Sequence, residues 1–77
     1  MATGKVLEVV GPVVDVKFPT NEMPNIFNAV KIEDASRDLD IVAEVAQHLG
    51  YDVPRCVATA STDRLIPGTS PVDTPPP

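Results

Sequence analysis

The sequence predicts a small all-β domain. Its core must be mainly aliphatic, because hydrophobic residues make up 43% of the 77 residues and aromatic residues only 4%. Valine and isoleucine, which are branched at Cβ, favour strands over helices. Short apolar stretches with partial alternation are separated by glycine and proline, which is typical of strands joined by tight turns. A chain of this length forms at most one domain with a small core.

Four stretches are predicted to be strands: residues 4–10, 13–18, 26–32 and 53–60. The second alternates most clearly, since Val14, Val16 and Phe18 share one face. Gly11-Pro12 separates it from the first strand as a bend. The fourth strand begins at Pro54, a position that a strand start tolerates.

The polar stretch 33–40, EDASRDLD, predicts a turn or hairpin loop. Its four acidic residues suggest a cation site, but a calcium loop needs oxygen ligands at alternate positions and a glycine at the sharp turn. This stretch has neither feature, so we predict no metal site.

Residues 41–50, IVAEVAQHLG, fit two structures. As a helix, the apolar residues form one stripe, with an aspartate before it and a glycine at its end. As a strand, Ile41, Val45 and Leu49 share one face, but the alternation is only fair. The local pattern by itself favours the helix.

The last part of the chain is rich in turns and proline. Residues 61–68 predict a turn-rich corner, and from Pro67 onward five of eleven residues are proline. Such a composition favours an extended, solvated segment. We therefore expect a folded domain over 1–73 and a flexible tail over 74–77.

Charge and cysteine content exclude several functions. A formal net charge of −5 disfavours attraction to nucleic acid and to anionic membranes. No apolar run approaches the ~20 residues that a membrane span needs, so we expect neither nucleic-acid binding nor direct membrane insertion. Cys56 has no second cysteine for an internal disulfide and is expected to be a small core residue.

The sequence indicates no catalytic or cofactor-binding residues. His48 has no partner at a recognisable spacing, and the Ser61-Thr62-Asp63 run is better explained as a turn. A phosphate-binding loop needs G-x-x-x-x-G-K-[ST], whereas Gly4-Lys5 is followed by Val6 and preceded by no such glycine. We expect no ATPase activity of this chain.

Several blocks nevertheless follow one another in a recognisable order: GKVLEVVGPVVDVKFP, MPNIFNAVKI, EVAQHLG, PRCVA and STDRL. Over about residues 3–74, they resemble the N-terminal β-barrel domain of the β subunit of F-type ATP synthase. GPVVDVKFP and EVAQHLG are the most specific pieces. The resemblance implies a closed or nearly closed six-stranded antiparallel β-barrel, in which 41–49 is a strand.

The resemblance also implies a role in assembly. In that family, barrels of the catalytic β subunit and the noncatalytic α subunit alternate in a collar at the top of the head, which holds the subunits together. The expected partners are α subunit barrels. The expected location is the cytoplasmic side of a bacterial inner membrane, or the equivalent organelle compartment, as a peripheral part of the complex. Proton-driven ATP synthesis would belong to the parent subunit.

Ten residues are expected to support the barrel: Gly11, Pro12, Val14, Val16, Phe18, Ile41, Val45, Leu49, Gly50 and Gly68. Six are expected on its exterior: Lys5, Asp15, Lys17, Lys31, Glu44 and Arg55.

The chain departs from the family pattern at Pro54, Arg64 and Pro67. Arg64 stands where the family has a glycine, whose freedom to adopt positive φ would be lost. These departures predict a weakened closure, and an open barrel would expose a sheet edge and self-associate. A free-standing small β-barrel that binds a protein partner is the alternative function.

Overall fold

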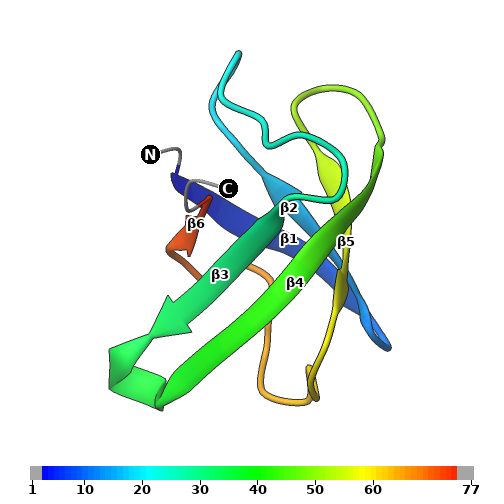
Figure 1. Cartoon of the computed structure of the whole chain (residues 1–77). Helices are drawn as coiled ribbons and strands as arrows, with labels where there is room; N and C mark the ends of the chain where they lie inside the picture. Colours follow the sequence, from blue (N-terminus) through cyan, green and yellow to red (C-terminus); the bar gives the residue numbers. More distant parts are fainter. Residues whose placement is uncertain (1–2, 75–77) are drawn as a thin grey trace.

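The computed structural model describes residues 3–74 and shows a closed barrel of six antiparallel strands (Figure 1). The elements are β1 (Thr3–Val10), β2 (Val13–Lys17), β3 (Ala29–Asp34), the 3-10 helix η1 (Ala35–Arg37), β4 (Leu39–His48), β5 (Pro54–Ala58) and β6 (Val72–Asp73). The predicted six-stranded all-β fold is confirmed. Of the predicted tail, residues 75–77 lie outside the described residues.

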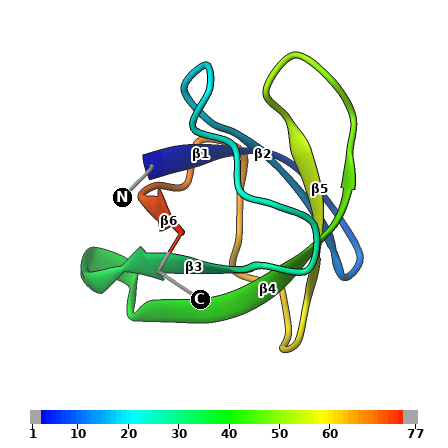
Figure 2. The same ribbon diagram turned by 45° about the horizontal axis from the view of Figure 1, so that its top comes forward.

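The strands follow one another around the barrel in the order β1-β2-β5-β4-β3-β6. β1 and β2 form one hairpin through Gly11-Pro12, and β3 and β4 form another through η1. β5 lies between β2 and β4 and joins the two hairpins into one sheet. Figure 2 shows β1 and β2 facing β3 and β4 across the barrel, with β5 and β6 at the two sides.

Residues 39–48 form the longest strand, β4, so the local helical interpretation is wrong and the strand implied by the resemblance is confirmed. Leu39, Ile41, Ala43 and Val45 are buried, and the residues between them are exposed. β3 pairs with one edge of this strand and β5 with the other. A helix here would leave both neighbours with an unpaired edge, and a helix of this length is marginal on its own.

The hairpin between β3 and β4 is tighter than expected. β3 begins at Ala29 and not at residue 26, and it extends to Asp34, so the turn shrinks to η1. Asp34 Oδ1 accepts a hydrogen bond from Ser36 N at 3.1 Å. Asp38 ends the turn with φ 53°, a left-handed conformation that aspartate tolerates. The acidic residues of this stretch therefore shape a hairpin.

Apolar side chains from every strand, most of them aliphatic, fill the interior, as is usual for a barrel with few strands. Phe18, just beyond β2, is the one aromatic ring among them. Among the described residues that are not exposed, no buried side-chain nitrogen or oxygen lacks a hydrogen-bond partner. The core consists of Val6, Val14, Val16, Phe18, Val30, Ile32, Leu39, Ile41, Ala43, Val45, Cys56, Leu65 and Val72.

β6 closes the barrel although it has only two residues. Val72 pairs with Gly4 on β1 and with Ile32 on β3, and Asp73 continues both ladders. The Val72 side chain is fully buried, so the closing strand also contributes to the core. The open barrel considered in view of Pro54, Arg64 and Pro67 is therefore not formed, while the strength of the closure stays a matter for experiment.

The structure accommodates the departures at Pro54 and Arg64 at two separate places. Pro54 is the first residue of β5, where a missing N–H is tolerated. Arg64 does not adopt positive φ, whereas Gly68 does, at 93°. Arg64 Nη1 donates a hydrogen bond to Asp38 O at 3.2 Å, and the Arg37 guanidinium donates to Arg64 O. The arginine thus ties the corner to the β3–β4 hairpin.

Gly4 is predicted to be sensitive to any added side chain. A Cβ at this position would lie 2.8 Å from Lys17 O and 2.9 Å from Val16 Cγ1, closer than packed atoms tolerate. We expect Gly4→Ala to lower the free energy of unfolding by about 1–3 kcal/mol, measured by urea denaturation. Lys5→Ala, at an exposed position on the same strand, should change it by less than about 0.5 kcal/mol. Equal losses in the two variants would contradict this explanation.

Candidate functional site

The residues expected to support the barrel occupy three kinds of position. Five lie in the core: Val14, Val16, Phe18, Ile41 and Val45. Three glycines have positive φ in turns: Gly11, Gly50 and Gly68. Pro12 is exposed, and its carbonyl accepts a hydrogen bond from Ala58 N at 2.8 Å, which connects the β1–β2 turn to β5.

Leu49 lies outside the core, with 40% of its surface exposed. The pairing of β4 with β5 shifts register between Val45 and Gln47. A bulge of this kind interrupts the alternation of side chains along the strand. The expected face shared by Ile41, Val45 and Leu49 is therefore wrong at its last member.

The polar residues considered as catalytic candidates take part in local structure. His48 Nε2 is hydrogen bonded to the Pro24 carbonyl at 2.8 Å. Asp63 N donates to Ser61 Oγ at 3.3 Å, and the Thr62 hydroxyl donates to Gly11 O. No cluster of His, Cys, Asp or Glu within residues 3–74 has a geometry that could hold a metal ion. In the same part of the chain, no helix is long and apolar enough to span a membrane.

The turn between β4 and β5 presents an exposed aromatic ring. Tyr51 and Asp52 have φ of 53° and 63°, and Val53 N donates to Gly50 O at 3.1 Å, which defines a type I′ turn. This turn prefers Asn, Asp or Gly, so a tyrosine at its first central position is strained. Tyr51 is 92% exposed, so burial of its side chain within this chain does not offset the strain.

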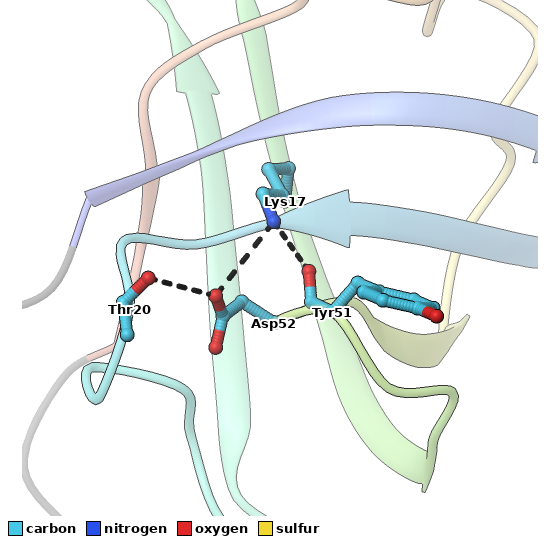
Figure 3. A network of polar contacts seen from close by, with 4 residues as sticks. All are labelled: Lys17, Thr20, Tyr51 and Asp52. Carbon is cyan, nitrogen blue, oxygen red and sulfur yellow. Dashed lines mark hydrogen bonds and ion pairs between the residues drawn. The ribbon is translucent and has the colours of Figure 1, made fainter.

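Contacts from the end of β2 hold this turn in place (Figure 3). The Lys17 ammonium donates to the Tyr51 carbonyl and lies 3.7 Å from the Asp52 carboxylate. Thr20 Oγ1 donates to the same carboxylate at 3.0 Å, and Phe18 N donates to Asp52 O at 3.0 Å. Sequence reasoning missed this network, because Tyr-Asp is not a usual type I′ pair and the partners are distant in sequence.

Asp15 and Arg55 form a bidentate ion pair between β2 and β5. The guanidinium donates from Nε to Oδ1 at 3.0 Å and from Nη2 to Oδ2 at 3.1 Å. Asp15 lies on the outer face, as expected, between the core residues Val14 and Val16, but its side chain is buried because Arg55 lies directly opposite and covers it. The hydrogen bonds and charge of Asp15 raise the pKa of Arg55. The pair lines a hollow of about 230 Å³ together with Glu8, Val10 and Val13.

The Cys56 thiol lies in the core, as expected from the sequence, between the paired positions Val14 and Val45 on the adjacent strands. Burial, and to a lesser extent the charge of Asp15, raises its pKa to about 12. The thiolate is the reactive form of cysteine. Cys56 is therefore a packing residue and not a nucleophile at neutral pH.

Together these features define a class: a small closed barrel with an aliphatic interior, in which the polar groups described above support turns, ladders and one outer ion pair. A family model described as the beta-barrel domain of the ATP synthase alpha/beta family matches residues 6–74. The chain belongs to this family. Because the family covers both kinds of subunit, the match identifies the domain and leaves the subunit to be assigned on other grounds.

The raised pKa of Cys56 predicts a specific dependence of stability on pH. The folded chain binds the thiol proton more tightly than the unfolded chain, so this stabilisation is complete below the ordinary pKa of 9.0 and is lost as pH rises toward about 12. We expect the wild-type chain to lose more stability than Cys56→Ala between pH 9 and 11, measured by urea denaturation. Parallel pH profiles for the two proteins would contradict the assignment.

Proposed function

We propose that the chain is the N-terminal barrel of the catalytic β subunit of an F-type ATP synthase and serves as an assembly domain in the collar of the head. Its partners in this proposal are the barrels of the noncatalytic α subunits. The head would be a peripheral part of the complex, on the cytoplasmic side of a bacterial inner membrane or in the equivalent organelle compartment. Proton-driven ATP synthesis is the activity of the whole complex.

The observation that carries the proposal is the closed and filled barrel of a domain from this family. Closure pairs both edges of the sheet, which makes the barrel stiff and blocks indiscriminate edge pairing. The interior is occupied by side chains, so the outer surface is the part that can meet a neighbour. A stiff unit that contacts other subunits through its exterior suits a collar.

The assignment to the β subunit is supported by the sequence blocks GPVVDVKFP and EVAQHLG, which resemble that subunit. The proposed role of the barrel itself is packing without chemistry. Its sequence has no G-x-x-x-x-G-K-[ST] loop, whose backbone N–H groups and lysine hold nucleotide phosphates. Nucleotide binding would be carried by other parts of the parent subunit.

A pair of chimeras tests the assignment. Residues 3–74 replace the N-terminal barrel either of a catalytic subunit or of a noncatalytic subunit, and each chimera is expressed with the remaining head subunits. We expect the catalytic chimera to assemble into the alternating head and the noncatalytic chimera to fail, as measured by native mass spectrometry. The opposite result would assign the chain to the noncatalytic subunit. Failure of both chimeras, with each chimera monomeric and folded, would contradict the collar role.

A further inference from the structure

We infer that the barrel has a binding site for a phosphate group where the start of β1 lies beside the end of β2, and that Lys5, Lys17 and Ser70 hold this group. The site is separate from the proposed assembly role and does not depend on it.

Two lysines lie side by side at this place. Lys5 on β1 and Lys17 on β2 are directly opposite each other in the antiparallel ladder, and both are exposed. Side chains in such a pair lie on the same face, and like charges there destabilise the sheet. The chain has only six lysines and arginines against eleven aspartates and glutamates, yet it places two of the six together. An anion bound between the two ammonium groups would offset their repulsion.

Lys5 differs from the other cationic side chains because it has no partner. Within residues 3–74 it forms no salt bridge and no side-chain hydrogen bond. Its charge is therefore available to an anion from outside the chain. The other cations and their partners are Lys17 with Tyr51 O and Asp52, Lys31 with Glu33, Arg37 with Arg64 O, Arg55 with Asp15, and Arg64 with Asp38 O.

A shallow hollow of about 460 Å³ lies against the lysine pair. Three neighbouring segments form it: β1, the end of β2 and the stretch that leads into β6 (Figure 1). The Thr3 hydroxyl is occupied, because it donates to Asp73 Oδ1 at 3.3 Å. Ser70 is exposed and is the other hydroxyl of the hollow, so it can donate to a ligand. The residues that line the hollow are Thr3, Gly4, Lys5, Lys17, Phe18, Pro19 and Ser70.

The kind of donor favours phosphate over carboxylate. Ammonium and hydroxyl groups are compact donors that can approach a tetrahedral oxyanion from different sides, as lysine does in many phosphate sites. A carboxylate is matched best by the planar guanidinium of arginine, and the described residues that line the hollow include no arginine.

Lys17 can contribute without releasing the β4–β5 turn. An ammonium group has three N–H donors. One is used by the Tyr51 carbonyl, and the Asp52 carboxylate lies at 3.7 Å, beyond hydrogen-bond distance. A further N–H is therefore left for a phosphate oxygen. Because Asp52 already compensates part of the Lys17 charge, Lys5 supplies the larger share of the attraction.

The test is a titration of the ¹⁵N-labelled chain with sodium phosphate, followed by NMR at constant ionic strength and about pH 7.5, where the phosphate carries close to two negative charges. We expect saturable shifts of the Gly4, Lys5, Lys17 and Ser70 amides. The dissociation constant should be about 1–10 mM, because the site is open to water.

Variants show whether the lysine pair is responsible. Lys5→Gln should weaken binding by at least about fivefold, because it removes the cation that has no partner. Lys31→Gln is the matched control, since this lysine lies on β3, has a 42% exposed side chain and pairs with Glu33; it should change the affinity by less than about twofold. Lys17→Gln, a second probe, should also weaken binding. A dispersed spectrum of each variant verifies that it is folded.

Two further ligands distinguish the source of the phosphate. Phenyl phosphate that binds more tightly than inorganic phosphate would assign the site to a phosphate group carried by a larger molecule, whose apolar part contacts Phe18 and Pro19. Equal affinities would assign it to the free anion. Acetate should bind more weakly than either.

Four results would overturn the inference: shifts that sodium chloride reproduces, equal affinities for acetate and phosphate, equal affinities of Lys5→Gln and Lys31→Gln, or no saturable shift up to about 50 mM phosphate, several times the expected constant. None of these results bears on the chimeras that test the assembly role.

Discussion

Closure of the sheet by β6 is the constraint on which the rest of the structure depends. The backbone around this strand reaches both β1 and β3: Val6 N donates to Thr69 O at 2.9 Å, and Glu33 N donates to Pro71 O at 3.3 Å. The Val72 side chain enters the core from the same segment. If this link opened, both neighbouring strands would have free edges and the core would lose one wall. A short strand can fulfil this role because the preceding corner is itself fixed by Arg37 and Arg64.

A closed barrel restricts where function can reside. Its interior is occupied by packed side chains, and β6 pairs with two residues on each of the strands β1 and β3. What remains is the outer surface, where a bulge at Leu7 and an ion pair between Asp15 and Arg55 give one face an unusual combination of apolar and charged groups. The proposed role in assembly therefore depends on this outer surface.

The sequence predicted the strands and the core residues better than it predicted the contacts on the outer surface of the barrel. Alternation placed Val14, Val16 and Phe18 in the core, and the family resemblance corrected the local helical pattern of residues 41–49. The sequence did not show which residues would pair across neighbouring strands. Asp15 and Arg55 are forty residues apart, and only the register of β2 and β5 brings them together. The two β-bulges could not be predicted from the sequence either. The register shifts that expose Leu7 and Leu49 depend on the partner strands and not on the residues themselves.

The account's central claim, that β6 closes the barrel as firmly as its other strands pair, is tested most directly by native-state hydrogen exchange. The amides of Val6, Glu33 and Gly68 all donate to carbonyls across this junction. We predict that they open with free energies within about 1 kcal/mol of those of the β4–β5 ladder, because all belong to one cooperative unit. Exchange of these three amides that is many times faster, with β4 and β5 still protected, would show that the barrel opens at β6 and would contradict the account.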